Sequence, residues 1–92
     1  MTRESETERY FVDAVLKRGG MTDKFTSLTR RGVADRIAYF PDGSVWFVEI
    51  KTIGGRLSAL QQIYARERRS MKQNYACLWT KDQVDEWVRN LP

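Results

Sequence analysis

The chain has 92 residues, and 16 lysines and arginines against 12 acidic residues give it a formal charge of +4. A hydrophobic content of 41% and a charged content of 30% are typical of one globular domain and not of a disordered chain or a membrane span. With no histidine and one cysteine, the composition excludes histidine-dependent catalysis, an internal disulfide and a soft-metal site, and it leaves carboxylates as ligands for hard cations such as Mg²⁺, Mn²⁺ or Ca²⁺.

The first predicted element is a helix from Ser5 to Arg18. Ser5 and Glu8 fit a capping box, and Gly19-Gly20 is a favoured C-terminal signal. Glu8 precedes the apolar positions by three, four and seven residues, so it borders the buried face of the helix. It either caps the helix or supplies a carboxylate to a site, and Glu4 is the alternative for the second role. The three positions at these spacings are Phe11, Val12 and Val15, and Ala14 also belongs to the apolar stripe.

A short first strand is predicted over Lys24–Leu28, with Phe25 pointing inward. Lys24 is either close to substrate phosphates or a solvated lysine that protects a sheet edge. Thr29-Arg30-Arg31-Gly32 follows as a basic loop, which could hold backbone phosphates by charge without reading sequence.

The next two runs, Val33–Phe40 and Val45–Lys51, flank Pro41-Asp42-Gly43-Ser44 and predict a β-hairpin. Glu49 and Lys51 project from the same side of the second strand, because side chains alternate along a strand.

Asp35 lies near the start of the preceding strand, where the hairpin can bring it across to Glu49. Two carboxylates and a lysine, Lys51, at one edge of a small sheet favour a metal-dependent phosphodiester site over a surface salt-bridge network.

Thr52–Arg56 contains two glycines and is predicted to be a turn. Ser58 to Gln61 fit a second capping box and begin a helix that reaches about Gln73. Gln61 therefore either caps the helix or lies beside the site. The helix is expected to bury Leu60, Ile63, Tyr64 and Met71, and to carry Arg66, Arg68 and Arg69 on its other faces.

Tyr75–Trp79 is predicted to be a buried strand, in which Cys77 is a small core residue and not a reactive thiol. Thr80 to Gln83 fit a third capping box and begin a short helix through Val88. Capping and alternation thus predict an α/β fold in the order αβββαβα.

Three segments closely resemble the VRR-NUC domain of the PD-(D/E)XK nuclease superfamily: Gly32-Val33-Ala34-Asp35, Glu49-Ile50-Lys51, and Gly55-Arg56-Leu57-Ser58-Ala59-Leu60-Gln61. The resemblance spans nearly the whole chain and implies a restriction-endonuclease-like fold, with a small mixed sheet flanked by helices, as a single domain over residues 1–92. The family's usual proline before the aspartate is Ala34 here, a change that removes no ligand.

The resemblance also implies the roles of the site residues. Asp35, Glu49 and the Ile50 backbone carbonyl would bind Mg²⁺ or Mn²⁺, and Glu8 would complete the coordination. Lys51 would orient water or stabilise charge, with Gln61 holding the lysine or the water. The expected DNA-binding residues are Lys24, Arg30, Arg31, Arg56, Arg66 and Arg69.

The function implied is metal-dependent endonuclease activity on branched DNA such as Holliday junctions. The protein is expected to be a cytoplasmic homodimer, encoded by a phage or prophage, with no membrane partner. Two alternatives remain open: a non-catalytic DNA-binding module of the same fold, and a nuclease that acts on flaps, nicks or RNA.

Overall fold

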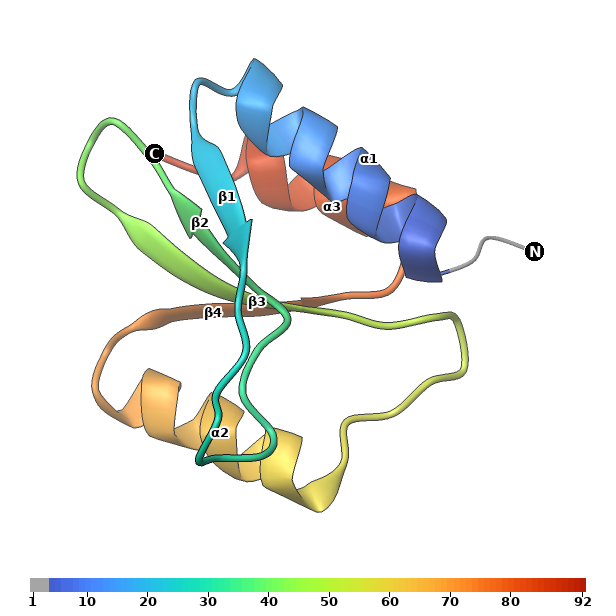
Figure 1. Cartoon of the computed structure of the whole chain (residues 1–92). Coiled ribbons are helices and arrows are strands. Elements are labelled where there is room, and N and C mark those ends of the chain that lie inside the picture. The colour runs from blue at the N-terminus through green and yellow to red at the C-terminus, as the bar shows by residue number, and fades with distance from the viewer. Residues whose placement is uncertain (1–3) are drawn as a thin grey trace.

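The computed structural model describes residues 4–92 and has the predicted order αβββαβα (Figure 1). The elements are α1 (Glu4–Lys17), β1 (Met21–Lys24), β2 (Arg36–Tyr39), β3 (Val45–Ile50), α2 (Ala59–Ser70), β4 (Asn74–Leu78) and α3 (Lys81–Arg89). None of the helices in this part of the chain has the length and hydropathy needed to cross a bilayer.

One four-stranded mixed sheet, in the order β1-β2-β3-β4, forms the middle layer. The first three strands pair antiparallel, and β4 joins β3 in parallel, with Glu49 opposite Cys77. The parallel pair needs a crossover, which α2 and its flanking loops supply. Helices α1 and α3 cover one face of the sheet, and α2 covers the other (Figure 1).

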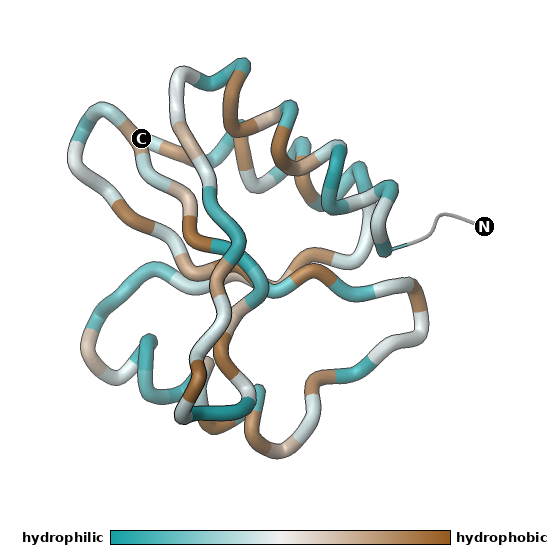
Figure 2. Tube along the Cα trace, in the orientation of Figure 1, coloured by the Kyte–Doolittle hydropathy of each residue, from teal (hydrophilic) through white to brown (hydrophobic). Residues whose placement is uncertain are grey.

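Each face of the sheet has its own core, because side chains alternate along the strands. Between the sheet and α1/α3 lies the α1–α3 core, whose buried members are Phe11, Val15, Ala38, Val48, Ile50, Leu78, Val84, Trp87 and Leu91. Between the sheet and α2 lies the smaller α2 core, whose buried members are Ala34, Tyr64, Ala65 and Tyr75. In Figure 2 the strands carry more hydrophobic residues than α2 does.

The hairpin between β2 and β3 is confirmed. Gly43 has a φ of +89°, and the Phe40 amide donates to the Ser44 carbonyl at 3.0 Å. The Asp42 carboxylate accepts from the Ser44 amide at 2.8 Å and fixes the turn.

Two predicted boundaries are wrong. The first strand is Met21–Lys24 and not Lys24–Leu28. Beyond Lys24 the chain leaves the sheet after one more bond, from the Phe25 amide to the Asp35 carbonyl (2.8 Å), and Phe25 packs on the α2 core. Ser5 is not an N-cap, because it lies inside α1.

The predicted buried stripe of α2 is correct only at Tyr64. Its other members, Leu60, Ile63 and Met71, are 48%, 40% and 56% exposed. The helix instead buries Ala65 and turns Arg68 inward over the Tyr64 ring, with the guanidinium carbon 4.4 Å from the ring centroid. Ala65 and the aliphatic stem of Arg68 thus take the place of the expected Leu60, Ile63 and Met71 beside Tyr64.

Candidate active site

The predicted acidic and lysine positions meet where β3 ends. Asp35 immediately precedes β2, and its Oδ2 accepts a hydrogen bond from the Ile50 amide at 2.8 Å. This bond fixes the Asp35 carboxylate against the last residue of β3. The hairpin therefore brings Asp35 to the strand that carries Glu49, as the sequence predicted.

Glu49 is a carboxylate that is only 2% exposed. It lies two residues after Phe47, on the face that α2 covers, and its Oε2 is 3.8 Å from the Lys51 Nζ. Its Oε1 is buried and has no hydrogen-bond partner within residues 4–92. Burial raises the pKa of Glu49 to about 8; the neighbouring Asp35 charge adds to this rise, and Lys51 opposes it.

Gln61 combines the two roles that the sequence left as alternatives. Its Oε1 accepts from the Ser58 backbone amide at 2.8 Å, and the Gln61 backbone amide donates to Ser58 Oγ at 3.2 Å. These two bonds complete the capping box of α2. Its Nε2 donates to Glu49 Oε2 at 3.2 Å. The cap therefore also orients the side chain toward the buried carboxylate.

Glu8 lies beside two cations and not beside Glu49. Its Oε2 accepts from Arg36 Nε at 2.9 Å and is 3.8 Å from Lys24 Nζ. Arg36 was not singled out from the sequence. It follows Asp35, so alternation sends it to the α1 side, where Glu8 borders the buried face.

Glu4, the alternative to Glu8, has an electrostatic effect on the site, because its charge contributes to the raised pKa of Glu49. Over residues 4–92 no group of three or more Asp, Glu or Cys side chains is arranged to hold a metal ion. The carboxylates that this structure brings together are Asp35 and Glu49.

The fold matches that of a solved structure over its whole length. A chain described as "VRR_NUC domain" superposes with a TM-score of 0.93 over 100% of both chains, at 24% sequence identity. The chain has the VRR-NUC fold. The predicted fold class, and with it the resemblance drawn from the three motifs, is confirmed.

The chain is also similar in sequence to a phage protein. A protein named "Putative nuclease p44" from Acyrthosiphon pisum secondary endosymbiont phage 1 is 41% identical over 61 residues. The match covers 66% of this chain and 66% of that relative. No protein-family model matches the chain.

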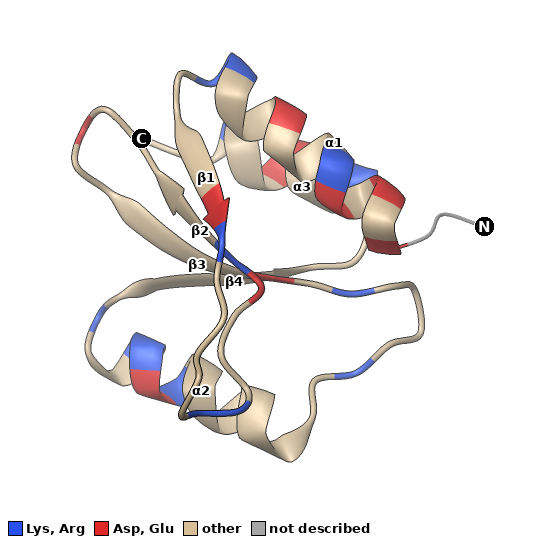
Figure 3. Cartoon of the chain, in the orientation of Figure 1, with Lys and Arg blue, Asp and Glu red and all other residues tan. Residues whose placement is uncertain are grey.

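The predicted DNA-binding residues differ in how firmly this VRR-NUC fold holds them. Arg30 forms an ion pair with Glu67 and lies over the Tyr64 ring, 5.3 Å from its centroid, so it ties the loop before β2 to α2. Arg69 lies over the Tyr75 ring at 5.1 Å. The remaining arginines of the set, Arg31, Arg56 and Arg66, are exposed. Figure 3 shows basic residues on α2, on the loop before β2 and on the segment between β3 and α2.

Cys77 packs against the α2 core of the VRR-NUC fold, on the strand beside Glu49. Burial, together with the Glu49 charge, raises the pKa of its thiol to about 12. The side chain is therefore a neutral thiol at physiological pH, which agrees with the core role expected from the sequence.

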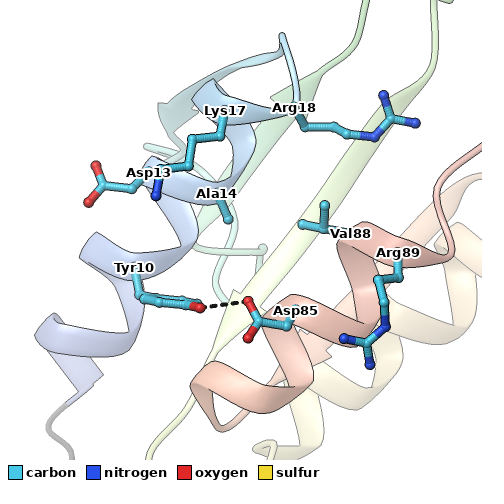
Figure 4. Close-up of a pocket in the computed structure, with 8 residues that line it drawn as sticks. All are labelled: Tyr10, Asp13, Ala14, Lys17, Arg18, Asp85, Val88 and Arg89. Atoms are coloured by element: carbon cyan, nitrogen blue, oxygen red, sulfur yellow. Dashed lines mark hydrogen bonds between the residues drawn. The ribbon is translucent and has the colours of Figure 1, made fainter.

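One hollow of the described region lies away from this site. A pocket of about 550 Å³ lies between α1 and α3, where Tyr10 donates to Asp85 at 2.6 Å (Figure 4). None of the predicted site residues lines it. The VRR-NUC fold thus places its candidate site at the end of β3, near the loop before β2 and the start of α2.

Proposed function

We propose that this chain is a metal-dependent, structure-specific DNA endonuclease that hydrolyses phosphodiester bonds in branched DNA. The observation that carries the proposal is the buried Glu49 carboxylate, held beside Asp35, Lys51 and Gln61, with one oxygen that has no partner in the described part of the chain, residues 4–92. A buried carboxylate without a full set of partners is costly in a purely structural role. The phage relative that carries the name of a nuclease supports the same assignment.

The residues fit a hard divalent cation. Glu49 offers a buried oxygen that has no hydrogen-bond partner within residues 4–92. Burial, together with the nearby Asp35 charge, raises the pKa of Glu49 to about 8, and a bound cation relieves the cost of holding both carboxylates ionised. Mg²⁺ often takes only one or two protein carboxylates together with water and substrate phosphate. Asp35, Glu49 and the Ile50 backbone carbonyl would hold Mg²⁺ or Mn²⁺.

When bound, the metal supplies Lewis-acid stabilisation of phosphate charge and lowers the pKa of a coordinated water. In the hydrolysis, a water oxygen bonds to phosphorus and releases a proton, a P–O ester bond breaks, and the leaving oxygen takes up a proton. Lys51 orients the attacking water or stabilises the negative charge that develops on the phosphate oxygens. Gln61 holds the Glu49 carboxylate in place through its Nε2.

The third carboxylate of the site is proposed to be Glu8, with Glu4 as the alternative. Glu8 would have to give up its bond to Arg36, which is 2.9 Å long in this structure. Glu4 is exposed, its side chain makes no ion pair within residues 4–92, and its charge already acts on Glu49. The two glutamates are therefore tested side by side.

DNA is proposed to lie across the end of β3, where exposed Arg31, Arg56 and Arg66 supply positive charge near the site. Lys24, Arg30 and Arg69 would contribute to the same electrostatic surface, although each already has a partner within the fold. Contacts of this kind hold backbone phosphates and do not select a sequence.

A homodimer with two sites is proposed for the cutting of opposed strands in a junction. The apolar side chains exposed on α2 and the loop before β2 support it: Leu28 is 103% exposed, Leu60 48% and Ile63 40%. A solution mass equal to one chain at micromolar concentration contradicts the dimer. The phage relative supports action in the cytoplasm of a bacterial host.

The decisive experiment compares the cleavage of a labelled four-way junction with that of a matched linear duplex, a flap, a nicked duplex and an RNA hairpin. Each substrate is incubated with Mg²⁺, Mn²⁺ or EDTA, using the wild type and Glu49→Gln. We expect symmetric, metal-dependent cuts in the junction alone, lost in Glu49→Gln. Cleavage of the flap, nick or RNA keeps the nuclease and discards the junction specificity. Junction binding without any cleavage supports the alternative, a DNA-binding module.

A further inference from the structure

The segment between β3 and α2 presents an isoleucine at the tip of a tight turn. Ile53 is 63% exposed. Two residues earlier in the chain is Lys51, whose Nζ is 3.8 Å from Glu49 Oε2. Two residues of chain span at most about 7 Å, so the Ile53 backbone stays next to the proposed catalytic lysine. In Figure 1 this segment projects from the body of the molecule beyond the end of β3.

The turn has a defined geometry. The Gly55 amide donates to the Thr52 carbonyl at 2.9 Å, and Gly54 has a φ of +86°. A positive φ at the third position, with a glycine there, is typical of a type II turn. Ile53 therefore occupies the second position, at the apex.

Both ends of the turn are anchored to the fold. The Lys51 amide donates to the Leu78 carbonyl at 3.0 Å, and the Trp79 indole donates to the Gly55 carbonyl at 2.8 Å. A β-branched side chain adds stiffness at χ1. The loop thus holds an apolar, stiff side chain in solvent, where it packs on no core cluster of residues 4–92.

A single exposed apolar residue needs no function by itself. The placement of Ile53 does suggest a function. Lys51 precedes it and exposed Arg56 follows it in the chain, so the apolar tip is flanked by two cations next to the site. Apolar side chains in such surroundings can enter DNA between base steps and unstack them, while cations hold the adjacent phosphates.

We propose that Ile53 is a wedge that packs against an unstacked base pair at the branch point and positions the adjacent phosphate at Glu49 and Lys51. This inference rests on the proposed nuclease function. Base pairs at a branch point open more readily than base pairs inside a continuous duplex, so the wedge enters a branched substrate at a lower cost. Ile53 is then a positioning residue that favours branched DNA.

The test uses a four-way junction with 2-aminopurine at the branch point and a linear duplex with the same label. Binding is measured in Ca²⁺, and cleavage is measured separately in Mg²⁺. The variants are Ile53→Ser, Ile53→Val as the conservative substitution, and Met21→Ala as a control, because Met21 is 69% exposed on β1.

With saturating wild type, Ile53→Val or Met21→Ala, we expect the junction fluorescence to rise. Ile53→Ser should abolish the rise and lower the preference for junction over duplex cleavage by about tenfold, a typical effect of losing one well-packed contact. A rise that persists in Ile53→Ser, or is absent in a wild type that binds and cuts the junction, overturns the wedge and leaves the nuclease standing. Failure of the wild type to bind or cut any DNA overturns both proposals.

Discussion

The two faces of the sheet are built on different principles. The α1–α3 core consists of aliphatic and aromatic side chains, and Phe11 and Trp87 pack there with ring centroids 5.2 Å apart. On the α2 side, the core tyrosines pack under arginines, and the buried Glu49 lies on the same face of the sheet. Of the four buried side-chain atoms without a partner in residues 4–92, three lie on the α2 side: Glu49 Oε1, Tyr64 Oη and Arg68 Nε.

This contrast separates stability from activity. Apolar burial on the α1–α3 side supplies free energy of folding without any chemical demand on the residues. On the α2 side the same sheet holds charges that are costly to bury but available to a ligand. Substitutions on the two faces should therefore differ in kind as well as in size.

The largest effect is expected from the charges at the end of β3. Asp35→Asn and Lys51→Ala should each lower the cleavage rate by about a thousandfold, because the first weakens a proposed metal ligand and the second removes positive charge beside the reacting phosphate. DNA binding should change far less. Single-turnover cleavage and a binding titration in Ca²⁺ measure the two quantities, and Lys17→Ala, on α1, is the control. Retained cleavage in either variant contradicts the site assignment.

On the opposite face, Phe11→Ala should lower the free energy of unfolding by about 3–5 kcal/mol. Phe11 is fully buried, and its removal leaves a cavity between α1 and the sheet. Denaturant unfolding measures the loss. The fraction of molecules that stay folded should keep the wild-type rate of cleavage. If the cleavage rate of Phe11→Ala falls by more than its fraction of folded molecules does, the two faces are coupled.

The pH dependence of stability should depend on Glu49. Burial raises its pKa to about 8 in the folded chain, well above the usual value of a glutamate, so the folded state retains a proton that the unfolded chain loses at lower pH. In the absence of metal, the free energy of unfolding should fall as pH rises from about 5 to 8. In Glu49→Gln this fall should be largely absent. Unfolding curves of both proteins at pH 5, 6.5 and 8 test the difference, and equal slopes would refute it.

The smallest effect is expected where α1 meets the site. Glu8→Gln should reduce cleavage by about tenfold or more if Glu8 is the third carboxylate, whereas Glu4→Gln should then leave the rate within about twofold. Mg²⁺ titrations of both variants distinguish ligand loss from a general defect. The reverse order would transfer the role to Glu4, and two unchanged rates would leave Glu8 as the partner of Arg36.

Much of this arrangement could be predicted from local patterns. The hairpin followed from Pro41 to Ser44, and the shared face of Glu49 and Lys51 followed from strand alternation. The caps at Ser58 and Thr80 placed the starts of α2 and α3. The capping box is complete at Ser58, whereas at α3 the Gln83 side chain accepts from the Trp79 amide and not from the Thr80 amide. The first strand was misplaced because Phe25 and Leu28 resemble strand residues, although Phe25 packs beneath a loop and Leu28 is exposed.

The sequence by itself determined the order of the elements, the hairpin and the residues that gather at the end of β3, because turns, caps and alternation act over a few residues. Only the tertiary structure decided which groups meet across elements. The bond from Gln61 to Glu49, the capture of Glu8 by Arg36 and the inward turn of Arg68 all depend on how the helices pack on the sheet. Such contacts depend on the packing of elements that are distant in the chain, and no local pattern specifies it.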